Sequence, residues 1–227
     1  MTISANIAMI NERIRAAAEG AERDPATVRL VAVSKTRPAT DICAAFLAGQ
    51  TVFGENYIQE LVPKLAEIRE DVQWHFIGHL QSNKVKYIAG RVALIHSVDR
   101  ISLAQEIDRQ WGRLGKVCDV LIQVNISGEA TKSGTTEAGA IQLVRESALL
   151  PNISVKGLMT MPPFFDDPDA ARPYFIELRR LAETISELQI AGVEMKELSM
   201  GMSGDFETAI QEGATLVRIG TAIFGER

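Results

Sequence analysis

Isoleucines near the start of the chain recur at the spacing of a helix. They stand three or four residues apart, at Ile3, Ile7, Ile10 and Ile14, and polar residues fill most positions between them. An apolar stripe of this period is typical of an amphipathic helix with one buried face. We expect this helix to pack against the body of the protein, because docking is a commoner use of a single stripe than targeting or dimerisation.

After Pro25 the pattern changes to short runs rich in β-branched residues, separated by longer segments. Eight such runs are strand candidates, at residues 28–34, 51–53, 74–77, 92–95, 118–124, 155–159, 197–199 and 215–219. Segments between them show helical periodicity, most clearly at 40–49, 101–114, 137–149 and 170–188. Strands that alternate with helices indicate parallel pairing through right-handed crossovers, and eight is the strand number of a (βα)8 barrel.

An open, doubly wound sheet would share this alternation of strands and helices. The first strand is followed by no G-x-G-x-x-G fingerprint, however, and the chain contains no G-x-x-x-x-G-K-[ST] loop. The closed barrel is therefore favoured. We expect an α/β protein in which residues 1–227 form a single-domain (βα)8 TIM-type barrel with an extra N-terminal helix.

Composition narrows the range of partners. The chain has 227 residues and a net charge of −5, which disfavours sequence-independent binding to nucleic acid. No apolar run approaches the ~18 residues that a membrane span requires. Only two cysteines are present, and the amino terminus lacks the features of a signal peptide, which together indicate a reducing cytoplasm. We expect a cytoplasmic monomer with no membrane or nucleic-acid partner.

Barrel enzymes carry their sites at the carboxyl ends of the strands, and Lys35 stands directly after the first predicted strand. An amine at a barrel mouth loses part of its hydration, and a partly neutral amine can attack an aldehyde to form a Schiff base. A lysine just past a strand is more often an ordinary surface residue. The functional interpretation therefore depends on what else lies in the same mouth.

The last two predicted strands end in residues suited to a phosphate group. Residues 199–204 supply Ser199, Ser203 and glycines that allow close approach, and residues 218–221 supply Arg218, Gly220 and Thr221. The loops after strands seven and eight of barrels commonly bind phosphate through backbone N–H groups. One such glycine or serine would merely turn a corner or cap a helix. Their coincidence on adjacent strands favours a phosphate site, and with it a functional lysine.

Seven segments that span nearly the whole chain carry a family resemblance. They are AVSKT at 32–36, GENY at 54–57, WHFIGHLQSNK at 74–84, VNI at 124–126, GLMTM at 157–161, LSMGMS at 198–203 and VRIGTAIFG at 217–225. Together they closely resemble the pyridoxal phosphate homeostasis family, which is related to the barrel domain of alanine racemase. The combination is highly specific, although a motif as short as the first would mean little alone.

The resemblance implies that Lys35 carries pyridoxal 5′-phosphate as a Schiff base and that Asn56 lies near the ring. It also implies a set of phosphate contacts from the last two strands: Ser199, Ser203, Gly220 and Thr221. Arg218 should face the pyridine nitrogen, by similarity to the racemase barrel. An arginine disfavours protonation of that nitrogen, so the ring is a weak electron sink and carbanion chemistry is poorly supported.

The sequence departs from the family at one place. Two acidic residues commonly follow the SMGMS segment, and here Gly204 and Asp205 stand there. We expect only the start of the next helix to change, where Asp205 still suits the positive end of the helix dipole.

The histidines do not predict a metal site. His75 and His79 fall on a strand and its exit, where four residues span roughly 13 Å, too far for one shared ion. No Cys, His or carboxylate cluster has the spacing of a structural zinc site either. We expect His75 and His96 to be strand residues with satisfied hydrogen bonds.

Three functions remain open. The favoured one is a carrier that binds, stores and delivers pyridoxal phosphate to dependent apoenzymes, without catalytic residues or substantial activity. The second is a pyridoxal-dependent amino-acid racemase or isomerase. Related racemases take their second base from an additional β domain, which we expect this chain to lack because it ends just after strand eight. The third is a barrel enzyme that acts on a phosphorylated metabolite without any pyridoxal.

Overall fold

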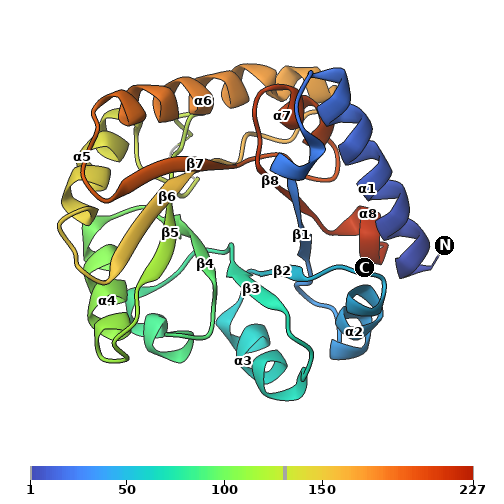
Figure 1. Cartoon of the computed structure of the whole chain (residues 1–227), viewed down its shortest axis with the longest axis horizontal. Coiled ribbons are helices and arrows are strands. Elements are labelled where there is room, and N and C mark those ends of the chain that lie inside the picture. The colour runs from blue at the N-terminus through green and yellow to red at the C-terminus, as the bar shows by residue number, and fades with distance from the viewer. Residues whose placement is uncertain (1, 130–131, 227) are drawn as a thin grey trace.

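Eight parallel strands close into a barrel in the order β1 to β8, with β8 paired back to β1. The computed structural model describes residues 2–129 and 132–226. Figure 1 shows the strands as a ring with helices around it. The strands are β1 (Arg29–Val33), β2 (Val52–Glu55), β3 (Gln73–Phe76), β4 (Leu94–Val98), β5 (Cys118–Gln123), β6 (Ile153–Met159), β7 (Val193–Ser199) and β8 (Leu216–Ile219). The predicted barrel is confirmed.

Helices follow most of the strands and cover the outside of the barrel (Figure 1). The α-helices are α1 (Ile3–Gly20), α2 (Ala39–Leu47), α3 (Ile58–Glu67), α4 (Ile101–Gly112), α5 (Glu137–Ser147), α6 (Arg172–Glu187), α7 (Phe206–Gln211) and α8 (Thr221–Phe224). Shorter 3-10 segments are η1 (Pro25–Thr27), η2 (Ser82–Tyr87) and η3 (Pro168–Ala171). Between β3 and β4 the helical part of the connection is η2.

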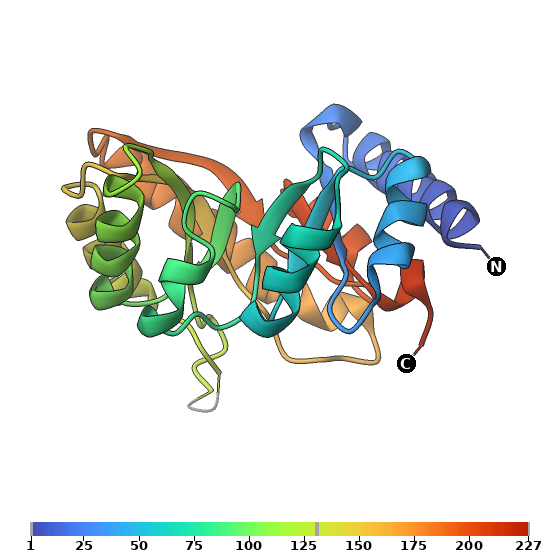
Figure 2. The same ribbon diagram turned by 90° about the horizontal axis from the view of Figure 1, so that it is seen from below.

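The first helix packs against the barrel as its apolar stripe predicts. Ile7, Ile10 and Ile14 are buried, and α1 contacts α2, α7 and α8. The Asn6 side chain donates a hydrogen bond to the carbonyl of Ile223 at 2.8 Å, and Arg13 pairs with Glu207. In Figure 2 the two ends of the chain consequently lie on the same side of the barrel.

Two apolar clusters account for the core. A large one lies between the strands and the helices, and a small one fills the inside of the barrel with Val31, Val52, Leu94, Leu121, Met159 and Leu216. Barrel interiors are usually packed by such branched side chains. Here four buried polar side chains share that interior: His75, His96, Ser199 and Arg218.

Two predicted strands differ from the structure by three or four residues at one end. Strand β7 begins at Val193 rather than at residue 197, and its first half carries Glu194 and Lys196, whose charges break the apolar pattern that marks a strand. Strand β4 covers Leu94–Val98 rather than residues 92–95, because His96 and Ser97 continue it as buried polar residues. Its register against β5 shifts between Ile95 and Val98, where a bulge interrupts the pairing.

No helix within residues 2–129 and 132–226 is long and apolar enough to cross a membrane.

Candidate functional site

A cavity of about 300 Å³ opens at the carboxyl ends of the strands. Six of the seven residues predicted for the site line it: Lys35, Asn56, Ser203, Arg218, Gly220 and Thr221. They come from β1, β2, β7 and β8 or the residues just after them. The seventh, Ser199, is fully buried beneath the cavity floor and touches Arg218 instead.

Lys35 enters the cavity from a tightly held turn. The preceding residue, Ser34, is fully buried and donates its hydroxyl to Glu55 Oε1 at 2.6 Å. Lys64 Nζ donates to the carbonyl oxygen of Ser34 at 2.8 Å and to the same Glu55 oxygen at 2.6 Å. In the part of the chain that the structure describes, Lys35 itself forms no ion pair, so its amine is free to meet a ligand.

The ion pair between Glu55 and Lys64 lies inside the protein. Glu55 has no exposed surface and Lys64 is 7% exposed. Burial raises the pKa of Glu55, while the hydrogen bonds from Lys64 and Ser34 act in the opposite direction. Sequence reasoning missed Lys64, although a signal existed: the lysine occupies a buried position on α3 in line with Ile58 and Leu61.

Asn56 lines the cavity and carries a buried, unsatisfied acceptor. Its Oδ1 is buried and has no hydrogen-bond partner among the described residues. The neighbouring backbone is packed tightly, since a Cβ on Gly78 would lie 2.1 Å from the Asn56 carbonyl oxygen. Buried polar atoms in folded proteins nearly always have a partner, so a donor from a ligand or a water is expected here.

The loops after β7 and β8 form an anion cradle. Backbone N–H groups of Ser203, Gly204, Gly220 and Thr221 make no hydrogen bond to other described residues. The Thr221 hydroxyl donates to Ser203 Oγ at 3.2 Å, which brings the two loops together. Unpaired backbone N–H groups that face one cavity suit a phosphate.

Asp205 shapes this cradle differently from the prediction. It stands at the start of α7, but its side chain makes no capping bond there. Its Oδ1 instead accepts the backbone N–H of Met202 at 2.6 Å, and so holds the loop before the helix. Burial raises the pKa of Asp205, with Met202 and Arg218 acting in the opposite direction.

Arg218 lies on the cavity floor and is held from below. Its Nη1 donates to Ser199 Oγ at 2.5 Å, and its Nη2 donates to the carbonyl oxygen of Thr160 at 2.9 Å. Burial lowers the pKa of Arg218 to about 10, with Asp205 acting in the opposite direction, so the guanidinium stays charged at neutral pH. Two of its five N–H donors are used below, which leaves donors for a ligand above.

An apolar wall completes the cavity. Part of it comes from the proline-rich loop after β6, through Phe164, Phe165 and Pro168. Met161 and Met202 line the cavity as well, whereas Met159 and Met200 are fully buried in the core.

No group of three or more His, Cys, Asp or Glu residues that could hold a metal ion occurs in the described ranges. His75 and His96 are strand residues, as predicted. Both nitrogens of His96 and Nδ1 of His75 are hydrogen-bonded, whereas His75 Nε2 has no partner among the described residues, so the prediction of satisfied hydrogen bonds is confirmed for His96 and only half met by His75.

This combination of fold and site defines a class: a closed (βα)8 barrel that presents a free lysine and an anion cradle at one mouth. The family described as "Alanine racemase, N-terminal domain" matches residues 5–227. An alanine racemase from Corynebacterium glutamicum has the same fold, with a TM-score of 0.73 over 96% of this chain and 61% of that one. Identity there is 17%, so this likeness concerns the fold alone.

Relatives with higher sequence identity show to which group within this family the chain belongs. The pyridoxal phosphate homeostasis protein of Aquifex aeolicus is 45% identical over 228 residues, which cover 100% of this chain and 99% of that protein. The structure of PipY from Synechococcus elongatus, determined with PLP bound, is 34% identical, with a TM-score of 0.86, and covers 99% of this chain and 100% of that one. The chain belongs to the pyridoxal phosphate homeostasis proteins of the alanine racemase N-terminal domain family.

Proposed function

We propose that this protein binds pyridoxal 5′-phosphate on Lys35 and serves in its homeostasis, as a carrier without substantial catalytic activity. One observation carries the proposal: a free lysine, an unsatisfied amide oxygen and an anion cradle line a single cavity. Relatives named for pyridoxal phosphate homeostasis, and a PLP-bound structure of similar fold, support the choice of ligand.

The cavity residues fit this cofactor. The cavity volume of about 300 Å³ lies at the lower end of the range of small-molecule pockets. The cradle offers unpaired N–H groups at one side, and Asn56 Oδ1 lacks a partner at another. Apolar side chains such as Ile77 and Met202 supply the flat, water-poor surface that an aromatic ring needs.

When bound, pyridoxal 5′-phosphate supplies an aldehyde that bonds reversibly to a primary amine. Lys35 Nζ would provide that amine, held at the turn that Ser34 and Lys64 fix. Backbone N–H groups of Ser203, Gly204, Gly220 and Thr221 would hold the phosphate. Asn56 would orient the ring by accepting or donating at its edge, and Ser199 would act indirectly, by placing Arg218.

Arg218 supports the carrier rather than the racemase. Its guanidinium has donors only, so it can bond an unprotonated ring nitrogen and disfavours a proton there. The charge that carbanion chemistry needs on the ring is then poorly stabilised. A two-base racemase also needs an acid or base opposite the lysine. The titratable side chains on the described cavity wall are Lys35, Asp205 and Arg218, and Asp205 is engaged with Met202.

Absorption in the visible range tests the binding. We expect purified protein incubated with the cofactor to turn yellow, and the Lys35→Ala variant to stay colourless. The exposed Lys86 provides a matched control, since Lys86→Ala should keep the colour. Borohydride reduction followed by peptide mapping should place the added mass on Lys35 and not on Lys64. A colourless wild-type protein would contradict the proposal and favour an enzyme that acts on another phosphorylated metabolite.

Chiral assays separate the carrier from a racemase. Turnover of any amino acid at ordinary enzyme rates, ~1 to 10³ per second, would contradict the carrier.

We further propose that the recipients are pyridoxal-dependent apoenzymes in the cytoplasm and that the protein acts as a monomer. Transfer to an apoenzyme, measured as recovered activity faster than with an equal amount of free cofactor, tests the first point, and sedimentation tests the second.

A further inference from the structure

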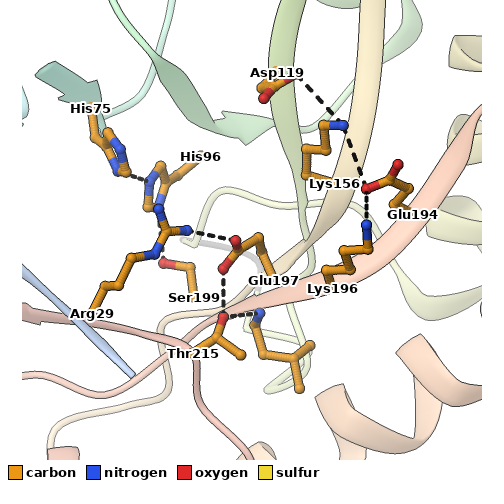
Figure 3. Close-up of polar contacts among 11 residues, drawn as sticks. Arg29, His75, His96, Asp119, Lys156, Glu194, Lys196, Glu197, Ser199 and Thr215 are labelled. Atoms are coloured by element: carbon orange, nitrogen blue, oxygen red, sulfur yellow. Dashed lines mark hydrogen bonds and ion pairs between the residues drawn. The ribbon is translucent and has the colours of Figure 1, made fainter. Parts of the chain in front are cut away.

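A second cavity, of about 280 Å³, lies at the opposite mouth of the barrel, at the amino-terminal ends of the strands. Figure 3 shows its charged side chains and His75, together with neighbouring residues. Three basic and three acidic residues line it and balance in charge: Arg29, Lys156, Lys196, Asp119, Glu194 and Glu197. The proposed function gives this cavity no role.

Some of these charges are already paired. Arg29 Nη2 donates to Glu197 Oε1 at 2.5 Å, and Lys196 lies 2.9 Å from Glu194. Asp119 is the least well paired, because its nearest cation, Lys156, lies 4.0 Å away and shares its charge with Glu194. Burial raises the pKa of Asp119, and Glu194 and Glu197 add to the shift while Lys156 opposes it, which marks a place short of positive charge.

His75 forms the floor of this cavity and keeps one nitrogen free. The imidazole is 2% exposed and lines the cavity, and its Nδ1 bonds His96 Nε2 at 3.0 Å. Its Nε2 has no hydrogen-bond partner among the described residues. The charge of Arg29 lies close enough to lower the pKa of His75, after burial the second cause of that shift. Arg29 and His75 line the same cavity, so both can donate to one ligand there.

A column of hydrogen bonds joins His75 to the first cavity, at the carboxyl ends of the strands, which we call the upper cavity. His75 bonds His96 at 3.0 Å, His96 Nδ1 bonds Ser199 Oγ at 2.8 Å, and Arg218 Nη1 bonds the same oxygen at 2.5 Å. These residues belong to β3, β4, β7 and β8, so the column crosses the inside of the barrel. Arg218 at its far end lines the proposed cofactor cavity.

The direction of this column follows from which groups can donate. Arg218 has donors only, so Ser199 Oγ accepts from it. The Ser199 hydroxyl then donates to His96 Nδ1, since no other acceptor from the described residues lies within hydrogen-bond distance of it. A neutral His96 consequently carries its proton on Nε2 and donates to His75 Nδ1. His75 then carries its proton on Nε2, and this N–H has no acceptor among the described residues of the lower cavity.

We propose that the lower cavity binds a small zwitterion with one carboxylate and one ammonium group, and that its occupancy strengthens the hold of Arg218 on the cofactor. The carboxylate would accept from His75 Nε2 and Arg29, and the ammonium group would lie at Asp119. In Figure 3 Arg29 and His75 lie on one side, and Asp119 with Lys156 on the other. The link to Arg218 rests on the proposed function, whereas the binding site does not.

A zwitterion fits better than a simple anion. The lining is neutral overall, so a net charge would remain uncompensated. His75 pairs in register with Leu94 of β4, which pairs with Asp119 of β5. Two strand spacings separate them, roughly 10 Å between backbones. The cavity therefore offers the donors of Arg29 and His75 on one side and the Asp119 carboxylate on the other, which suits the opposite charges of a zwitterion.

The binding step is tested by calorimetry with N,N-dimethylglycine, which is zwitterionic and cannot bond an aldehyde. We expect saturable binding that Arg29→Gln and Asp119→Asn each weaken at least ~10-fold, the typical loss of one charge-assisted hydrogen bond. Arg180→Gln, on the exposed face of α6, should leave it unchanged. Acetate and methylammonium should bind more weakly than the zwitterion. No binding, or acetate binding as tight as that of the zwitterion, would overturn the proposal.

The link is tested by the rate at which the yellow holoprotein loses its cofactor to a dilute trap. Saturating N,N-dimethylglycine should slow this loss at least ~5-fold, the lower end of coupling between sites. At equilibrium, bound cofactor should raise the affinity for the zwitterion by the same factor by which the zwitterion raises the affinity for the cofactor. Ser199→Ala should remove the effect of the zwitterion on cofactor loss and keep zwitterion binding. Ser199→Thr retains the hydroxyl and should keep both.

Failures of the two proposals can be distinguished. A protein that holds the cofactor and binds no zwitterion overturns the second site alone. Zwitterion binding with no change in the rate of cofactor loss overturns the link. A protein that binds the zwitterion and never takes up pyridoxal 5′-phosphate overturns the proposed function and the link together. If Ser199→Ala does not fold, Ser199→Cys offers a weaker donor at the same place and should reduce the coupling.

Discussion

Lys64 Nζ lies 2.6 Å from Glu55 Oε1, inside the protein and directly beneath the turn that carries Lys35. Its other bond, to the carbonyl of Ser34, ties α3 to the end of β1. Buried ion pairs add little net stability compared with apolar residues, but removal of one partner leaves a buried charge. The pair therefore holds the turn that carries Lys35 in place, and substitution of either partner alone should disturb the site.

Lys64→Met should reduce the free energy of unfolding by about 3–5 kcal/mol, the usual cost of breaking a buried pair. The double variant Glu55→Gln with Lys64→Met removes both charges and should recover part of that loss. Urea unfolding at neutral pH measures both. Lys86→Met, on the surface, is the control. Equal stability of Lys64→Met and the wild type would contradict the buried pair.

Much of the upper site could be predicted because barrel geometry gathers strand ends. Lys35 and Asn56 follow β1 and β2, and Ser203 and Gly220 follow β7 and β8, so the order of the strands alone brings them together. Ser199 was predicted as a phosphate contact and lies below Arg218 instead. Its side chain is the last one of β7 that points into the barrel. The position of a residue at the end of a strand does not tell whether its side chain is still buried in the barrel or already lines the open cavity.

The lower mouth could not be predicted in the same way. The charges of Glu194 and Lys196 concealed the first half of β7, because a run with alternating charges does not resemble a buried strand. The contact of His96 with Ser199 joins residues 103 positions apart, from strands that are not neighbours in the barrel. Such a contact depends on barrel closure and on side-chain rotamers, neither of which has a local signal in the sequence.

Ser203→Ala should weaken retention of pyridoxal 5′-phosphate without unfolding the barrel. The variant removes a hydroxyl that faces the cradle, and a hydrogen bond to a charged group contributes about 1.5–3 kcal/mol. Retention through repeated dialysis, followed by visible absorption, should fall ~10-fold or more. Ser186→Ala, on the exposed side of α6, should match the wild type. Full occupancy of Ser203→Ala after dialysis would place the phosphate elsewhere.

Gly201→Ala should destabilise the loop that carries Ser203. Gly201 has φ of +89°, where side chains are strained, and a Cβ there would lie 2.6 Å from the Cβ of Ala209 in α7. Strain of this kind costs of order 1–3 kcal/mol. Thermal unfolding of the apoprotein should show the loss. Gly20→Ala, where a Cβ would meet nothing within 4 Å, should unfold at or slightly above the wild-type temperature. A stable Gly201→Ala variant would contradict the tight approach of loop and helix.

The buried histidines should make the protein less stable as the pH falls. Burial lowers the pKa of His75 to about 3, with Arg29 adding to the shift. Burial also lowers the pKa of His96 well below its usual value, with His75 and Arg218 as further causes. The unfolded chain binds protons near pH 6.5, where the native protein leaves both rings neutral.

The contribution of the two histidines to the free energy of unfolding is therefore fully present above pH ~6.5 and is lost as the pH falls toward 3. The free energy of unfolding should decline between these limits by about 1.4 kcal/mol per pH unit for each histidine. Urea unfolding at several pH values from 7 to 5 measures this slope. His96→Gln removes one of the two protons taken up on unfolding, and should reduce the slope by about 1.4 kcal/mol per pH unit. Nuclear magnetic resonance supplies an independent check, because the ring signals of His75 and His96 should stay constant from pH 7.5 to 5. A titration of either ring near pH 6.5 would show that the column admits a proton, and the donor order from Arg218 to His75 could not then hold.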